Sequence, residues 1–94
     1  MIKSFADAET EKLFSNCYVK AFDEVIKPAR LKLKLIDYAS RLSDLETPPG
    51  NKLEALQGDL SGFYSIRINK QWRICFKWDG NGARQVGISK HYGD

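Results

Sequence analysis

The side chains best suited to chemistry in this sequence are two arginines, Arg67 and Arg73, and its single histidine, His91. A guanidinium group binds phosphate through two parallel hydrogen bonds, and an imidazole, with a reference pKa of about 6.5, transfers protons near neutral pH. Two arginines that face each other across a sheet repel unless an anion lies between them. The sequence therefore predicts an anion-binding site with a proton-transfer group, if the fold brings the three side chains together.

A β-hairpin over residues 63–78 is the element that positions the arginines. Apolar side chains alternate with other residues on both sides of residues 69–71, and a three-residue loop there keeps all of the apolar residues on one face. A two-residue loop would mix the two faces, so the pattern itself selects the register. The other face then holds three cross-strand pairs: Arg67 with Arg73, Ser65 with Cys75, and Phe63 with Lys77.

A final strand over residues 84–89 extends this polar face. Val86 and Ile88 are expected in the core, so we expect the intervening residues to point with the arginines. His91 joins them if the extended conformation continues. A polar face is also simply what an antiparallel sheet presents to solvent when helices cover only its other side. The residues that share the arginines' side of this strand are Gln85, Gly87 and Ser89.

The remaining elements must cover the apolar face of the sheet. Residues 2–5 are typical of a short strand, Asp7 is a good N-cap for a helix running to about Asn16, and Pro28 suits the first turn of a second helix. After a break at 48–50, residues 52–56 are an expected edge strand. The predicted fold is α+β, a short N-terminal strand and two helices packed on one face of a three- to four-stranded, mainly antiparallel sheet. The second helix is predicted to bury one apolar stripe: Leu31, Leu35, Tyr38 and Leu42, widened by Ala29, Leu33 and Ile36.

Length, charge and cysteine content narrow the class of protein. Ninety-four residues predict one domain over residues 1–94, and a hydrophobic content of 43% excludes a disordered chain. No apolar run could cross a bilayer and no secretory signal follows Met1, so we expect a cytoplasmic protein without a membrane partner. One histidine and two distant cysteines, Cys17 and Cys75, favour neither a disulfide framework nor a zinc site, and we expect no cofactor. The net charge of +3 lies entirely in residues 51–94, which permits a nucleic-acid partner without requiring one.

Three segments of the sequence, 52–59, 62–69 and 71–76, resemble the HigB toxins, the host-inhibition-of-growth branch of the RelE/ParE superfamily. They share the pattern Gly-x-Tyr-Ser-x-x-x-Asn-x-x-Trp-Arg-Ile, which runs here from Gly62 to Ile74. Residues 2–5 and 48–53 are also similar, so the resemblance covers essentially the whole chain.

The resemblance implies a RelE-like fold and a toxin that enters the A site of the 70S ribosome and cleaves mRNA there without a metal ion. It also implies a cognate HigA-type antitoxin with a helix-turn-helix domain, through which alone the toxin is brought to operator DNA. Such cleavage needs a base for the 2′-OH, cations for the phosphate and an acid for the leaving oxygen. Arg73 matches the arginine of the family's Trp-Arg-Ile motif, and Glu54, His91 and Tyr92 are the candidates for proton transfer. The expected RNA-binding residues are Arg67, Lys52, Lys77, Lys90 and Phe63.

Two departures from the family pattern leave the acid and the base open. Glu54 stands where many relatives carry histidine, and His91-Tyr92 reverses the usual order of tyrosine and histidine. Two other functions also fit the sequence: a ParE-like inhibitor of DNA gyrase without catalysis, and a degenerate toxin retained as an antitoxin-binding module. In every case the first helix and the basic outer side of the second are the expected antitoxin surfaces.

Overall fold

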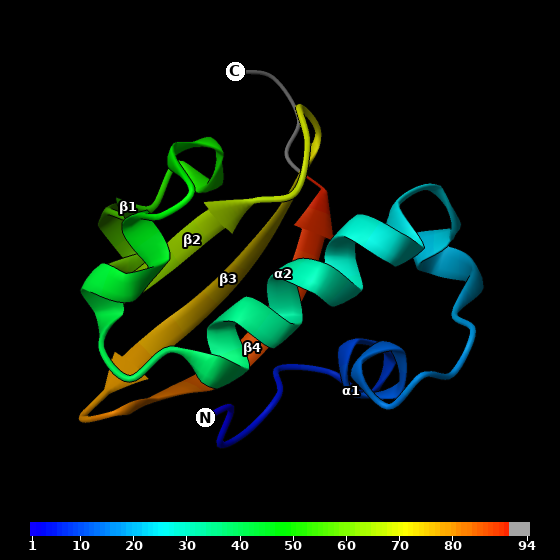
Figure 1. Ribbon diagram of the computed structural model, residues 1–94, viewed down its shortest axis with the longest axis horizontal. Coiled ribbons are helices and arrows are strands. Elements are labelled where there is room, and N and C mark those ends of the chain that lie inside the picture. The colour runs from blue at the N-terminus through cyan, green and yellow to red at the C-terminus, as the bar shows by residue number, and fades with distance from the viewer. Residues whose placement is uncertain (91–94) are drawn as a thin grey trace.

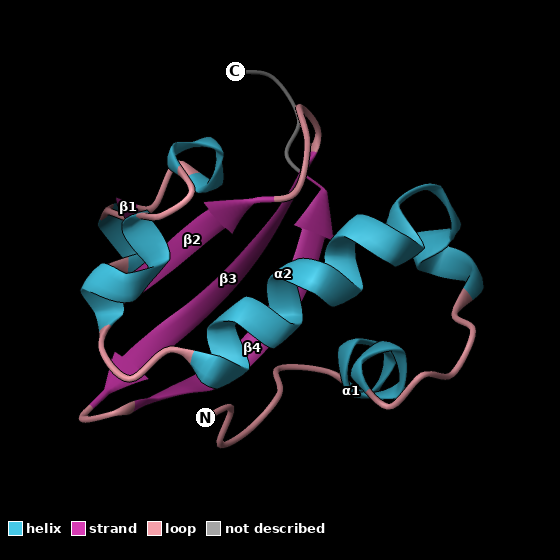
Figure 2. Cartoon of the chain, in the orientation of Figure 1, coloured by secondary structure: helices cyan, strands magenta, loops and turns pink. Residues whose placement is uncertain are grey.

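The computed structural model describes residues 1–90 and has the predicted α+β architecture. Two helices, α1 (Ala8–Phe14) and α2 (Ile26–Tyr38), pack on one face of a four-stranded antiparallel sheet. Figure 1 shows α2 lying across the sheet with α1 beside it, and Figure 2 separates the helical layer from the strands. The sheet order is β1-β2-β3-β4, with strands Glu54–Ala55, Phe63–Arg67, Trp72–Asp79 and Gly82–Lys90.

The hairpin of β2 and β3 has the predicted register, which is therefore confirmed. Ser65 lies opposite Cys75 and Arg67 lies opposite Arg73. The side chains of Ile74 and Phe76 are fully buried under the helices. Because side chains alternate along a strand, burying this apolar set forces the arginines onto the uncovered face.

The first helix begins as predicted, because the Asp7 side chain accepts a hydrogen bond from the Thr10 N–H at 2.7 Å. It ends at Phe14 rather than at Asn16, which has a left-handed φ of 70°. The preceding segment, predicted as a short strand, makes only two isolated parallel bridges with β4, at Ile2 and Phe5. It thus borders the sheet beyond β4 without forming a regular strand.

The predicted buried stripe of α2 is wrong in part. Leu31 and Tyr38 are 59% and 80% exposed, whereas Ala29, Leu33 and Ile36 form the buried face. Both sets have helical spacing, so periodicity alone does not choose between them. The short side chain of Ala29 allows close packing against the sheet, and the buried face continues the apolar residues of the preceding 3₁₀ segment, Lys20–Val25.

The last strand contains a β-bulge that the sequence did not indicate. Cys75 pairs with Gly87 but Lys77 pairs with Arg84, so β4 holds one extra residue between them. Gln85 has a φ of 53°, and the predicted alternation fails there. Arg84 therefore lies across from Lys77 on the open face, while Gly87 and Ser89 take their predicted places.

The predicted edge strand over residues 52–56 is shorter than expected. Only Glu54 and Ala55 pair with β2, because Lys52 has a left-handed φ of 46°. Within residues 1–90, no helix is long and apolar enough to cross a membrane. His91 and Tyr92 lie outside the described residues, so their predicted placement is not addressed by this structure.

Candidate functional site

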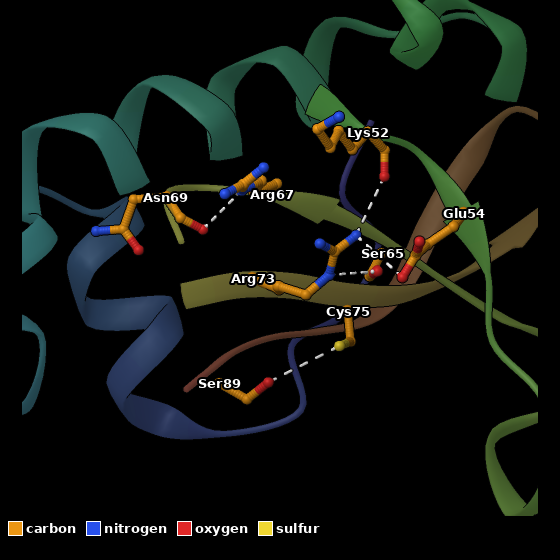
Figure 3. A network of polar contacts seen from close by, with 8 residues as sticks. All are labelled: Lys52, Glu54, Ser65, Arg67, Asn69, Arg73, Cys75 and Ser89. Atoms are coloured by element: carbon orange, nitrogen blue, oxygen red, sulfur yellow. Dashed lines mark hydrogen bonds and ion pairs between the residues drawn. The ribbon is translucent and has the colours of Figure 1, made fainter. Parts of the chain in front are cut away.

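Arg73 is the centre of the open face of the sheet, where its guanidinium group is held by three different segments (Figure 3). Its Nε donates to the Ser65 Oγ at 2.8 Å, and its Nη2 donates to the Lys52 carbonyl oxygen at 3.1 Å. The same Nη2 lies 3.5 Å from the Glu54 Oε1. The Arg73 side chain is only 14% exposed, yet its Nη1 makes no hydrogen bond within residues 1–90. One edge of the group is thus fixed while the other has unused donors.

The carbonyl of Lys52 faces Arg73 because of the turn that precedes it. Asn51 is fully buried and ends the 3₁₀ turn η3 (Pro49–Asn51). Its amide nitrogen donates to the carbonyls of Leu45 and Thr47 at 3.1 and 3.2 Å, and its Oδ1 accepts from the Lys32 Nζ. This anchoring fixes Lys52 in its left-handed conformation, which directs its carbonyl towards the sheet.

A pocket of about 230 Å³ opens beside Arg73. Arg73 and Ser65 supply polar groups, while Leu56 and Leu60 supply apolar surface from the segment that folds over the sheet. Such a mixture suits an anion attached to a flat or apolar group. The lining residues are Glu54, Leu56, Leu60, Ser65, Arg73, Cys75, Ser89 and Lys90.

Arg67 lies across from Arg73 but is held differently. Its Nε donates to the Asn69 carbonyl at 3.1 Å, and within residues 1–90 it forms no ion pair. Two cationic side chains therefore stand side by side on the open face, and within residues 1–90 the only carboxylate that pairs with either is that of Glu54, which is 59% exposed. This excess of positive charge favours an anion between the two guanidinium groups.

Phe63 and Lys77 occupy the other end of the same face. The Lys77 Nζ lies 5.2 Å from the centre of the Phe63 ring, a cation–π contact. Arg84, across from Lys77, pairs with Asp79 and holds the pKa of that carboxyl below its ordinary value through the hydrogen bond and charge of its guanidinium group. The structure thus places an aromatic ring and a further lysine in line with the arginines, along the direction of the strands.

Lys90 lines the same pocket as Arg73, but its ammonium group is engaged elsewhere. Its Nζ lies over the ring of Trp72 at 5.5 Å and 3.8 Å from the Glu24 Oε1, on the face that the helices cover. Trp72 packs edge-on against Phe22 there, so the ammonium group of Lys90 points away from Arg73.

Some residues of the site were not predicted as functional. Ser65 is fully buried and accepts from Arg73, while the Ser89 Oγ lies 3.8 Å from the Cys75 Sγ. Both serines alternate with core residues along their strands, which places them on the same face as Arg73. This alternation could have identified them as site residues from the sequence. Leu56 and Leu60 carry no such signal, because they reach the pocket through an irregular segment that includes the short 3₁₀ turn Gly58–Leu60. Among residues 1–90 no group of three acidic, histidine or cysteine side chains is arranged to hold a metal ion.

The fold defines a class of small α+β proteins with an open, cationic sheet face, and solved structures share it. YafQ from E. coli superposes with a TM-score of 0.68 at 15% identity, over 99% of this chain and 100% of that one. YoeB in the YoeB–YefM complex from Staphylococcus aureus gives 0.60 at 22% identity, over 100% and 99%. At these identities the likeness concerns the fold alone.

Sequence comparison then identifies the family. Residues 3–91 match the HigB-like toxin family, described as the RelE-like toxin of the type II toxin-antitoxin system HigB. Toxin HigB-1 of Vibrio cholerae is 45% identical over 60 residues, which span 64% of this chain and 63% of that protein. An uncharacterised protein of Haemophilus influenzae is 31% identical over 78 residues, or 83% and 77%. This chain belongs to the HigB-like family of RelE-like toxins of type II toxin-antitoxin systems, and the predicted resemblance is confirmed.

Proposed function

We propose that this chain is a ribosome-dependent endoribonuclease that cleaves mRNA in the ribosomal A site and so arrests translation. The observation that carries the proposal is Arg73, whose guanidinium group is clamped beside a pocket and opposite Arg67. A fixed cation with unused donors suits a phosphate that gains charge in the transition state. RelE-like toxins are generally endoribonucleases, which adds support to this reading.

The proposed reaction is a transesterification that uses side chains alone. A base removes the proton of a ribose 2′-OH, the oxygen attacks the adjacent phosphorus, and the bond to the 5′-oxygen breaks as an acid protonates that oxygen. Arg73 and Arg67 bind the non-bridging phosphate oxygens, so the scheme requires no metal ion. Glu54 is a candidate base because its carboxylate is exposed and lies beside Arg73. His91 and Tyr92 remain the other candidates for proton transfer.

The remaining face of the sheet provides room for the neighbouring nucleotide. Phe63 offers a ring on which a base can stack, and Lys77 adds charge at the same position. Lys52 contributes its exposed ammonium group in addition to its carbonyl. The ammonium group of Lys90 is not part of the proposed surface, because it lies with Trp72 and Glu24.

We further propose a cognate HigA-type antitoxin with a helix-turn-helix domain, through which the toxin is brought to operator DNA, and action in the cytoplasm, where ribosomes and mRNA are found. Membership of a toxin-antitoxin family implies an antitoxin partner, and the related YoeB was solved in complex with YefM. Co-expression with the antitoxin is expected to yield a stable complex and to restore growth.

The test is primer extension on a defined mRNA incubated with the purified protein, with and without programmed 70S ribosomes. We expect cuts only with ribosomes, and their loss in Arg73→Ala. Lys12→Ala is the control, since it removes one positive charge from an exposed position of α1, on the other side of the sheet, and should leave cleavage intact. Growth arrest without any mRNA cuts would instead indicate gyrase inhibition. The absence of both mRNA cuts and growth arrest would indicate a degenerate module.

A further inference from the structure

The outward side of α2 carries an exposed stripe that the fold does not use. Lys27, Leu31, Lys34 and Tyr38 follow one another at i, i+4, i+7 and i+11, so they lie in one row along the helix. Figure 1 shows that this helix is the outermost layer above the sheet. We call these four residues the α2 stripe. An exposed row of alternating cations and large apolar groups is unusual for a free surface.

Two further exposed apolar side chains belong to segments that are bonded to the flank of α2. Arg30 donates to the Cys17 carbonyl at 2.9 Å, which brings the segment containing Tyr18 alongside the helix. The Ile2 N–H donates to the Asp37 Oδ1 at 2.8 Å, which brings Met1 towards the Tyr38 end. Met1 and Tyr18 are 63% and 64% exposed. Of the large apolar side chains that are exposed within residues 1–90, only Leu60 belongs to another region, the pocket.

The charge of α2 is positive, because the helix carries four basic residues and one acidic residue, Asp37. Within residues 1–90 neither Lys27 nor Lys34 forms an ion pair. The nearby carboxylates are already engaged: Asp23 accepts from the Tyr18 hydroxyl, Asp37 from the Ile2 N–H, and Glu24 from the Trp72 indole. A second copy packed on the same stripe would bring four lysines into one interface, so charge disfavours self-association.

We propose that the α2 stripe is the docking surface for an acidic, amphipathic helix of the antitoxin. Its apolar side chains would cover Leu31 and Tyr38, and its carboxylates would pair with Lys27 and Lys34. This inference rests on the proposed antitoxin partnership. The surface lies on the opposite side of the sheet from Arg73, so changes here can be separated from changes in cleavage.

The experiment measures the affinity of the purified full chain for its purified cognate antitoxin by calorimetry, together with growth arrest in the absence of antitoxin. Leu31→Ser/Tyr38→Ser and Lys27→Glu/Lys34→Glu should each weaken binding roughly 100-fold, because apolar anchors and their charged partners dominate such interfaces. Both variants should still arrest growth and should no longer be neutralised. Lys70→Glu/Lys77→Glu, which changes the net charge equally at exposed positions of the β2–β3 hairpin, should bind the antitoxin like the wild type.

Wild-type affinity in both stripe variants would overturn the proposal, as would a wild-type chain that does not bind the antitoxin. Analytical ultracentrifugation tests whether a second copy of the chain covers the stripe instead. If the wild type is a dimer, the stripe variants are monomers and their antitoxin affinity is unchanged, the surface serves self-association. If the nuclease proposal is wrong, the wild-type chain makes no ribosome-dependent cuts. The antitoxin affinities of the wild type and the stripe variants are unaffected by that result.

Discussion

The two arginines of the open face differ in how firmly they are held. Arg73 has fixed partners on β1, β2 and the turn before β1, whereas Arg67 is bound only to a carbonyl of its own loop. A group whose position is set in advance binds a transition state without reordering. We therefore assign Arg73 to the scissile phosphate and Arg67 to a supporting contact.

The Ser65 hydroxyl group, on β2, holds the guanidinium group of Arg73 in position. Ser65→Ala removes the acceptor of the Arg73 Nε in a buried setting and lets the guanidinium group rotate. We expect single-turnover cleavage to fall about 10- to 100-fold, the effect of losing a hydrogen bond to a charged group. Ser61→Ala, at an exposed position outside the pocket lining, is the control and should cleave normally. Equal cleavage by Ser65→Ala and the wild type would remove Ser65 from the site.

Glu54 can be tested as a base with a substitution that keeps its shape. In Glu54→Gln the amide oxygen can still accept from Arg73, but it cannot take a proton from the 2′-OH. We expect the single-turnover rate to fall roughly 100-fold or more, which is typical for loss of a general base. A rate within about twofold of the wild type would mean that His91 or Tyr92 acts as the base instead. The variants His91→Gln and Tyr92→Phe would then test these two residues.

At the scale of elements, the N-terminal segment is tied tightly to β4. The Lys3 N–H donates to the Ala83 carbonyl at 2.7 Å, and the Ala83 N–H donates to the Met1 carbonyl at 2.9 Å. Gly82 precedes Ala83 and lies against Met1 and Lys3 of this segment. A Cβ atom there would come within 2.8 Å of the Met1 carbonyl oxygen, so glycine is required by space rather than by conformation.

Gly82→Ala should therefore loosen the N-terminal segment. The clash involves backbone, which cannot rotate away as a side chain can, and we expect a loss of about 1–3 kcal/mol in the free energy of unfolding by urea. Gly50→Ala is the control, because nothing lies within 4 Å of a Cβ at that position. A Gly82→Ala protein as stable as Gly50→Ala would show that the segment is not fixed to β4 in solution.

The short 3₁₀ helix after α2 (Leu42–Glu46) depends on Asp44, whose carboxylate accepts from the backbone N–H groups of Ser40 and Arg41 at 2.9 and 3.2 Å. These bonds hold the pKa of Asp44 below its ordinary value. A lowered folded pKa means that the contribution is complete above the unfolded pKa and disappears as the pH falls through the folded value.

Asp44→Asn is accordingly expected to lower the Tm slightly, by a few degrees at most, at pH 7. The Tm difference from the wild type should shrink as the pH falls below the pKa of an unfolded aspartate, about 3.9, and on through the lower pKa of folded Asp44. Thermal unfolding followed by circular dichroism between pH 3 and pH 7 provides the measurement. A difference that stays constant over this range would show that charge on Asp44 has no part in the effect.

At the scale of the whole molecule, the sheet separates two surfaces for which we propose different partners. One is the open face with Arg67 and Arg73, and the other is the α2 stripe with Lys27 and Lys34. Both are positive, so net charge alone does not tell a nucleic-acid surface from a protein-docking surface. Their apolar groups differ: the open face has the half-buried ring of Phe63 and Leu60 at the pocket, whereas the α2 stripe has Leu31 and Tyr38.

Salt dependence should distinguish these two positive surfaces. For binding to a single-stranded RNA oligonucleotide, each phosphate contact adds about 0.7 to the slope of log K against log salt. Arg67→Gln should reduce the slope by roughly that amount. Lys34→Gln, on the α2 stripe, should leave it unchanged. A slope that falls equally in both variants would mean that RNA binds without preference for the open face.

The sequence was most informative where a pattern had only one consistent arrangement. The hairpin register follows from alternation and from the length of the loop, because a shift by one residue would expose Ile66 and Ile74 and bury Arg67 and Arg73. The helix α2 offered two arrangements, since apolar residues recur on both of its sides. Packing against the sheet selected the side of Ala29, Leu33 and Ile36, and no local pattern contains that information.

The sequence by itself therefore determined the fold class, the pairing of Arg67 with Arg73 and the family to which the chain belongs. Only the tertiary structure decided how Arg73 is held, where the pocket lies, that Lys90 points to the helical face and that the α2 stripe is exposed. The reason is physical: alternation and helical periodicity act over a few residues. The contacts of Arg73 with the Lys52 carbonyl and of Lys90 with Glu24 join residues far apart in the chain, and only packing of the whole domain brings these together.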